Sequence, residues 1–141
     1  MLKRMPPNPG VIMIFGTGLD IIEIDRIKNS IKKYSPKFEQ KIFTSTEIDY
    51  CQSQGDPAKH FAARFAVKEA VSKCMGTGIR ESLGFKDMEV INEETGKPIL
   101  VMTGKGKELF EKLKLKSIHI SISHDSTHAI AHAIAEQQVV H

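Results

Sequence analysis

Hydrophobic and polar positions follow two different periods along the chain, and these periods predict which segments are strands and which are helices. Residues 14–24 are mostly β-branched or apolar and predict a strand, which two glycines loosen. Apolar residues then recur at helical spacing up to about Tyr34, with lysine and arginine between them. This pattern predicts a short amphipathic helix with a basic outer face, which ends at Ser35 and Pro36.

End signals predict two further helices. Residues 44–47, Thr-Ser-Thr-Glu, have the pattern of a capping box, so a helix should begin there and reach about Gln52. Pro57 suits the first turn of a helix, and neither glycine nor proline interrupts the chain from there to Gly76. We therefore expect the longest helix of the protein between Pro57 and Gly76.

The second half of the chain predicts two hairpins and one more helix. Residues 85–92 and 97–102 are strand-like and flank a turn that contains glycine. Residues 104–115 form a lysine-rich helix with an apolar stripe, and residues 117–123 and 127–135 alternate between apolar and polar side chains. The predicted fold class is α+β, with helices packed on a small antiparallel sheet.

Composition limits the classes of protein to which the chain can belong. With 141 residues, 40% hydrophobic and 26% charged, it has the size and apolar content of one folded domain. No apolar run approaches the roughly 20 residues of a membrane span, so no membrane association is expected. Basic and acidic residues are nearly balanced, and the formal net charge of +3 is too small to indicate a nucleic-acid-binding protein by itself.

The cysteines and the first residues bear on location and domain limits. Cys51 and Cys74 lie far apart and form no CxxC pair, which favours neither a zinc site nor a disulfide and fits a reducing cytoplasm. Residues 1–12 combine basic side chains with three prolines and lack an apolar segment, so we expect a disordered leader there. A single domain over residues 13–141 follows.

Two sets of acidic and basic residues are candidates for chemistry. Asp20 lies between apolar neighbours, where a carboxylate needs a cation or hydrogen-bond donors, although a helix start or an edge strand would also explain it. Glu69 and Lys73 are four residues apart and share a helix face. They form either an ordinary stabilising pair or, because their neighbours on that face are small or apolar, a pair that lines a cleft.

Two more positions carry weaker signals. Gly76 and Gly78 follow the longest helix, either as a glycine cap or as backbone that approaches a phosphate closely. His124 ends a strand in the apolar phase, where a histidine is more often hydrogen-bonded than functional.

In their order along the chain, these residues resemble the 4′-phosphopantetheinyl transferase family, in its single-domain holo-[acyl-carrier-protein] synthase form. The motifs are residues 14–27 (IFGTGLDIIEIDRI), residues 61–73 (FAARFAVKEAVSK), residues 76–78 (GTG) and residues 121–124 (SISH). The resemblance implies transfer of 4′-phosphopantetheine from coenzyme A to a serine of apo-acyl carrier protein, which releases adenosine 3′,5′-bisphosphate and supports fatty acid biosynthesis.

The resemblance also implies roles for the candidate residues. Asp20 and Glu69 would hold Mg²⁺ against the pyrophosphate of coenzyme A. Glu69, directly or through water, would take the proton from the serine, and Lys73 would stabilise charge on the departing phosphate. His124 would be a catalytic residue that lies near the nucleotide and its phosphates. Gly76 and Gly78 would form part of the coenzyme A wall.

Partner recognition and assembly follow from the same resemblance. Arg26, on the basic helix, is the residue expected to bind the acidic carrier protein, with nearby lysines adding attraction. Family members of this size resemble homotrimers with sites at subunit boundaries, so Asp20 and Arg26 are expected to face Glu69 of a neighbouring subunit. One rival interpretation is a small basic RNA-binding module, but the chain is only 6% aromatic and no strand carries paired rings on which bases could stack. The other is a transferase of broader specificity for carrier domains, but such enzymes resemble two fused copies of this unit and the chain has one.

Overall fold

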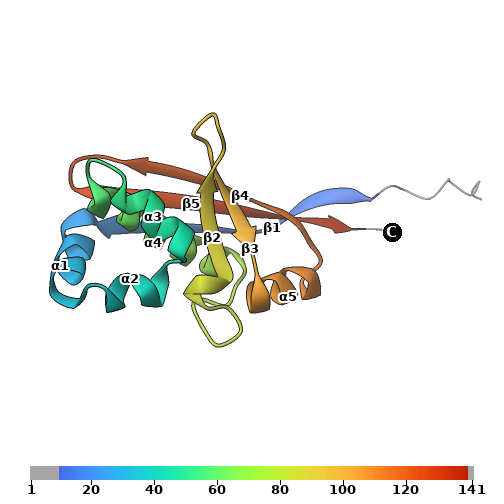
Figure 1. The fold of residues 1–141 in the computed structure, drawn as a ribbon. Coiled ribbons are helices and arrows are strands. Elements are labelled where there is room, and N and C mark those ends of the chain that lie inside the picture. The colour runs from blue at the N-terminus through green and yellow to red at the C-terminus, as the bar shows by residue number, and fades with distance from the viewer. Residues whose placement is uncertain (1–9, 140–141) are drawn as a thin grey trace, which may run out of the picture.

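A computed structural model describes residues 10–139 and shows one layer of helices on a three-stranded sheet, with a separate two-stranded hairpin beside them (Figure 1). The elements, in chain order, are β1 (Val11–Glu23), α1 (Ile24–Tyr34), α2 (Lys37–Ile42), α3 (Ser45–Gln52), α4 (Pro57–Cys74), the 3₁₀ turn η1 (Phe85–Asp87), β2 (Met88–Asn92), β3 (Pro98–Met102), α5 (Gly104–Lys112), β4 (Leu115–His124) and β5 (His128–Val139).

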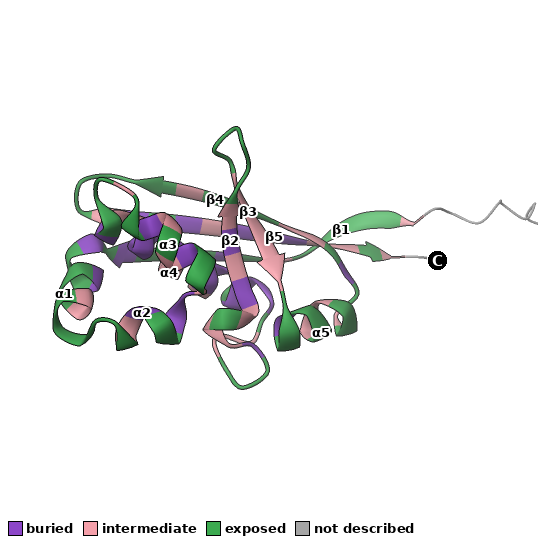
Figure 2. Ribbon diagram, viewed as in Figure 1, coloured by how far each residue is buried: buried purple, intermediate pink, exposed green. Residues whose placement is uncertain are grey.

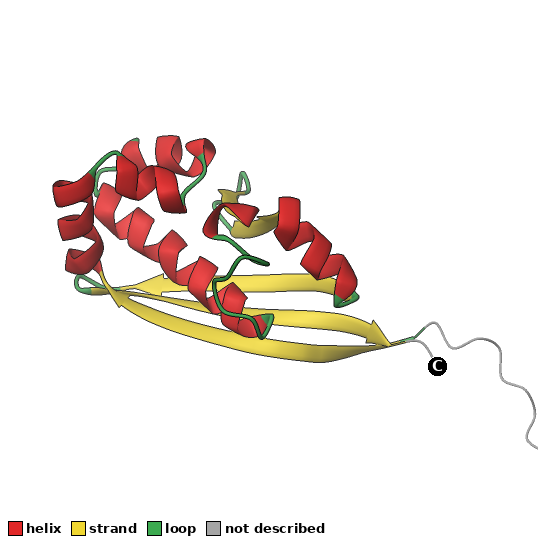
Figure 3. Ribbon diagram, turned by 90° about the horizontal axis from the view of Figure 1, so that it is seen from below, coloured by secondary structure: helices red, strands yellow, loops and turns green. Residues whose placement is uncertain are grey.

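The main sheet is antiparallel with strand order β1-β5-β4, and β2 pairs with β3 in the hairpin. All helices lie on one side of the main sheet (Figure 3). The other side carries exposed apolar side chains on β1 and β5, with Leu19 61%, Ile21 60% and Ile130 38% exposed. Within one chain, the main sheet is therefore covered on one face only.

Helix α4 is the centre of the core. Twelve of its 18 residues are buried, so the helix packs on nearly all sides (Figure 2). One side meets the sheet, where Ala129, Ala131, Ala133 and Ala135 of β5 are fully buried. These small side chains let the helix lie close to the strands.

Two glycines of β1 allow the closest contact between α4 and the sheet. A Cβ atom added to Gly18 would lie 1.8 Å from the carbonyl oxygen of Ala70, and one added to Gly16 would lie 2.4 Å from that of Cys74. Both distances are far shorter than any real contact, so only glycine fits at these positions. The two glycines therefore hold β1 against α4. The pairing of β1 with β5 is also irregular between Ile14 and Gly16, within the segment that the sequence predicts to be loosened.

A fully buried ion pair joins α4 to the segments on its other side. Lys68 Nζ lies 2.6 Å from Glu47 Oε1 and 2.8 Å from the carbonyl oxygen of Ile42. Glu47 also accepts hydrogen bonds from the backbone amides of Thr44 and Val90. Because burial is only partly offset by Glu47, the pKa of Lys68 is lowered. The network fixes α3 and β2 to the turn of α4 that contains Glu69.

The predicted elements are largely confirmed. Helix α1 has the predicted limits, the capping box of α3 is present with both of its hydrogen bonds, and α4 begins at Pro57. Helix α2 was not predicted. Residues 11 and 12, assigned to the leader, are in fact strand, because they pair with Val139 and Gln138 of β5. Residues 1–9 of the predicted leader lie outside the described residues.

In the part of the chain that the structure covers, every helix is too short or too polar to cross a membrane.

The glycine contact predicts a specific loss of stability. Gly18→Ala should lower the free energy of unfolding by about 2 kcal/mol or more, because β1 and α4 must separate to admit a methyl group. Urea denaturation measures this loss. Gly55→Ala is the matched control, since a Cβ atom at Gly55 meets nothing within 4 Å. Equal stability of Gly18→Ala and wild type would contradict the close packing.

Candidate functional site

The candidate site forms where β1 crosses α4. Asp20 faces the helix, two residues after Gly18, and its side chain is 17% exposed. Lys73 of α4 reaches across, with its Nζ 3.1 Å from Asp20 Oδ1 and 3.0 Å from the carbonyl oxygen of Leu19. The Lys73 side chain is 52% exposed, so it can leave this ion pair at little cost.

Glu69 completes a cluster of three charged groups with Asp20 and Lys73. Partial burial, and then the negative charge of Asp20, raise the pKa of Glu69, while Lys73 acts in the opposite direction. Asp20 and Glu69 are therefore close enough to repel each other electrostatically, and the half-exposed ammonium group of Lys73 partly offsets this repulsion. Because negative charge is unfavourable here, protonation of Glu69 or binding of an additional cation beside the two carboxylates is favoured.

Asp20 and Glu69 interact electrostatically within one chain. The reason is the packing of β1 on α4, which places them on the same side of the helix. The expectation that Asp20 and Arg26 face Glu69 of a neighbouring subunit stays a prediction. The ion pair of Lys73 differs from the simple helical pair, because its partner is Asp20 on the strand.

Within residues 10–139, there is no group of three or more His, Cys, Asp or Glu side chains arranged to hold a metal ion. Asp20 and Glu69 supply only two carboxylates. Two carboxylates do suit Mg²⁺, which usually keeps several water molecules and takes its remaining oxygen ligands from substrate phosphates.

Gly76 and Gly78 cap helix α4. Both have positive φ, +82° and +67°, which favours glycine. Their amides donate to the carbonyl oxygens of Lys73 and Ser72 respectively, so these N–H groups are already used by the helix end. The cap interpretation is therefore confirmed, and any contact of these glycines with coenzyme A would come from their small size.

His124 lies away from the cluster. It is exposed at the end of β4, where it pairs with Ala129, whereas Asp20 lies two strands away and pairs with Ala131. Strand geometry separates the two residues by roughly 12 Å. His124 also acts electrostatically on His60, which precedes Glu69 by nine residues, or about 13 Å along α4. A single chain does not bring His124 to the carboxylates.

Arg26 is exposed on the first turn of α1, which directly follows β1. It lines a shallow hollow of about 180 Å³ with Ile21, Ile22, Glu23 and His128. No ion pair holds the guanidinium group among residues 10–139, so Arg26 is available to an acidic partner.

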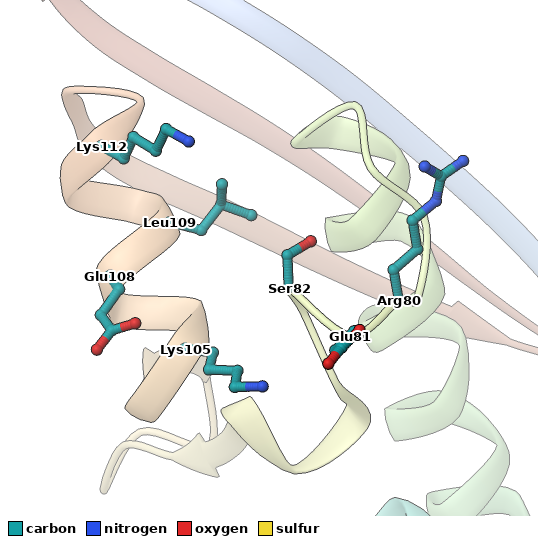
Figure 4. A pocket seen from close by; sticks show the side chains of 7 residues that line it. All are labelled: Arg80, Glu81, Ser82, Lys105, Glu108, Leu109 and Lys112. Carbon is teal, nitrogen blue, oxygen red and sulfur yellow. The ribbon is translucent and has the colours of Figure 1, made fainter.

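A cavity of about 540 Å³ lies elsewhere, between α5 and the loop that follows α4 (Figure 4). Lys105, Glu108, Leu109 and Lys112 come from α5, and Arg80, Glu81 and Ser82 come from the loop. None of the residues singled out from the sequence lines it. Its charges are mixed and its loop side chains are exposed, so size alone does not make it the functional site.

Comparisons with known proteins place the chain in a family. Residues 16–134 match the model of the 4′-phosphopantetheinyl transferase superfamily. A holo-[acyl-carrier-protein] synthase of Geotalea daltonii is 41% identical over 125 residues, which span 89% of this chain and all of the relative.

Solved structures give the same result. The crystal structure of a holo-[acyl-carrier-protein] synthase from Neisseria meningitidis matches with a TM-score of 0.83 and 31% identity, covering 87% of this chain and 98% of that one. The Helicobacter pylori counterpart, in complex with coenzyme A, matches with a TM-score of 0.76 and 31% identity, covering 84% of this chain and 98% of that one.

The raised pKa of Glu69 predicts that this residue is unfavourable for stability when no cation is bound. Because the folded pKa lies above the ordinary value of 4.5, the folded protein binds the proton more tightly than the unfolded chain does. The bound proton stabilises the folded protein fully below pH 4.5. This stabilisation is lost as the pH rises through the folded pKa of Glu69. Glu69→Gln should therefore be more stable than wild type at pH 7.5 in the presence of a chelator.

Urea denaturation at pH 7.5 and at pH 4 measures this difference, which should shrink at the lower pH. Glu94→Gln, in the exposed turn between β2 and β3, is the matched control and should leave stability unchanged at both pH values. A Glu69→Gln variant that is less stable than wild type at pH 7.5 would show that the carboxylate is structural.

Proposed function

The chain belongs to the 4′-phosphopantetheinyl transferase superfamily, and we propose that Asp20, Glu69 and Lys73 form its transfer site. The enzyme transfers the 4′-phosphopantetheine group of coenzyme A to apo-acyl carrier protein. The observation that carries the assignment of the site is the meeting of two carboxylates and one mobile ammonium group on a rigid strand and helix.

The residues of the cluster fit Mg²⁺. Asp20 and Glu69 offer two carboxylate groups as oxygen ligands, and burial together with the charge of Asp20 raises the pKa of Glu69 despite Lys73, which supports a place for an additional cation. We propose that these two carboxylates hold the ion. When bound, Mg²⁺ would neutralise charge on the pyrophosphate of coenzyme A.

The chain's own residues would then act on the serine of the carrier protein and on the leaving group. Glu69, directly or through a water molecule, accepts the proton of the serine hydroxyl. The serine oxygen forms a bond to the phosphorus atom that carries pantetheine, and the phosphoanhydride bond to the adenosine 3′,5′-bisphosphate breaks. Lys73 leaves Asp20 and places its positive charge beside the departing phosphate, which takes the bonding electrons.

His124, Gly76 and Gly78 are proposed to contact coenzyme A. The histidine would meet the nucleotide and its phosphates, and the glycines would form part of the wall beside Lys73. Because His124 lies roughly 12 Å from Asp20 within one chain, coenzyme A must extend between them or a neighbouring subunit must supply the histidine.

We propose a homotrimer in which the bare face of the main sheet is the contact surface. Leu19, Ile21 and Ile130 are exposed there. An apolar sheet face of this kind is normally covered by another layer of protein. Neighbouring subunits would add to the coenzyme A and carrier sites. A fully active monomer in sedimentation experiments would contradict this assembly.

The cytoplasm and fatty acid biosynthesis are the proposed setting of the reaction. Both cysteines are free and buried, which suits a reducing compartment. Loss of holo-carrier and of fatty acid synthesis in cells depleted of the protein would test this setting.

Transfer itself is tested by mass spectrometry of the carrier protein. With Mg²⁺, coenzyme A and apo-acyl carrier protein, the wild type should add one phosphopantetheine group. Asp20→Asn should lower the rate by about 100-fold or more, because charge at the phosphates is no longer neutralised. Asp25→Asn, five residues away on exposed α1, should retain the wild-type rate. Full activity of Asp20→Asn would remove Asp20 from the site.

Carrier binding is tested separately through Arg26. Arg26→Ala should raise the KM for the carrier protein by about tenfold at low salt and leave kcat unchanged, because an exposed charge contributes mainly to encounter. The effect should shrink as the salt concentration rises. Lys112→Ala, which removes a basic side chain from the last turn of α5, is the control. An unchanged KM for Arg26→Ala would place the carrier elsewhere.

A further inference from the structure

Another cavity, away from the transfer site, is lined by a buried carboxylate with one unpartnered oxygen among the described residues. The cavity has a volume of about 400 Å³ and lies between α1, α2 and the beginning of α4. Its lining includes Glu39, which is only 2% exposed. Neither Asp20, Glu69 nor Lys73 belongs to the lining.

The hydrogen bonding of Glu39 is half complete. The hydroxyl of Ser35 donates to Oε2 at 2.5 Å, but Oε1 has no hydrogen-bond partner among residues 10–139. No lysine or arginine in that part of the chain lies within ion-pair distance of this carboxylate. A buried carboxylate oxygen without a donor costs free energy, so it is a strong acceptor for any cation that reaches it.

The remaining lining restricts the ligand. Ile31, Ala58 and Phe61 supply apolar surface, whereas Gln52, Asp56 and Lys28 are exposed polar groups. Two carboxylates and one lysine leave an excess of negative charge, which disfavours a phosphate or another anion. The apolar walls formed by Ile31, Ala58 and Phe61 offer no oxygen ligands to a hydrated metal ion and suit an organic body better. The volume falls within the range of small-molecule sites.

From these features, we propose that the cavity binds a small organic ammonium ion, with its charged end at the half-partnered Glu39 carboxylate and its apolar body against Ile31 and Phe61. This site is independent of phosphopantetheine transfer. It lies on the inner side of α1, the helix whose exposed residues are proposed to meet the carrier protein.

Two probes of the same shape test the charge requirement without any mutation. 2-Phenylethylammonium and the neutral 2-phenylethanol are titrated into the full-length protein, and binding is followed by protein NMR shifts and calorimetry. The ammonium ion should bind at least about tenfold more tightly, because a charge-assisted hydrogen bond to a buried carboxylate is lost in the alcohol. Equal binding of both compounds, or no saturable binding of the ammonium ion, would overturn the proposal.

A conservative variant tests the position. Glu39→Gln keeps an oxygen that can accept from Ser35 but removes the charge, so it should weaken binding of 2-phenylethylammonium by about tenfold or more. Its melting temperature and its transfer activity should stay close to wild type, which shows that the fold and the first site are intact. Glu94→Gln, at an exposed turn, should bind as wild type does. Unchanged affinity in Glu39→Gln would also overturn the proposal.

Discussion

The close contact between β1 and α4 is the constraint on which the rest of the structure depends. Gly16 and Gly18 bring the strand backbone against the carbonyl oxygens of the helix, and the buried alanines of β5 continue this thin interface. This short separation lets Asp20 interact electrostatically with Glu69 and form an ion pair with Lys73. A methyl group at Gly18 would change the core and the site together.

Two neighbouring charged groups on α4, Lys68 and Glu69, lie in opposite electrostatic environments. Glu47 and Lys68 are buried, paired and surrounded by additional hydrogen bonds, so they fix the middle of α4. One residue further along, Glu69 has a raised pKa and no comparable partner among residues 10–139. The rigid pair thus supports a carboxylate that is unfavourable until a cation arrives, which is typical of functional groups.

Local signals predicted most of the elements, whereas packing decided the site. The capping box at Thr44 and the proline at Pro57 act within one turn, so the sequence alone was sufficient for α3 and α4. In the sequence alone, Gly16 and Gly18 indicate only a flexible strand. Their close contact with α4 becomes visible only in the folded chain. Similarly, no local pattern shows that Asp20 and Glu69 meet within one chain, because 48 intervening residues leave the pairing to tertiary structure.

The most direct test of the shared cation is a titration of Mn²⁺, as a spectroscopic substitute for Mg²⁺, with the free ion followed by electron paramagnetic resonance in the presence of coenzyme A. One ion per chain should bind to the wild type. Asp20→Asn and Glu69→Gln should each weaken binding by about tenfold or more, and the double variant should be little worse than either alone. Wild-type affinity in both single variants would contradict the account.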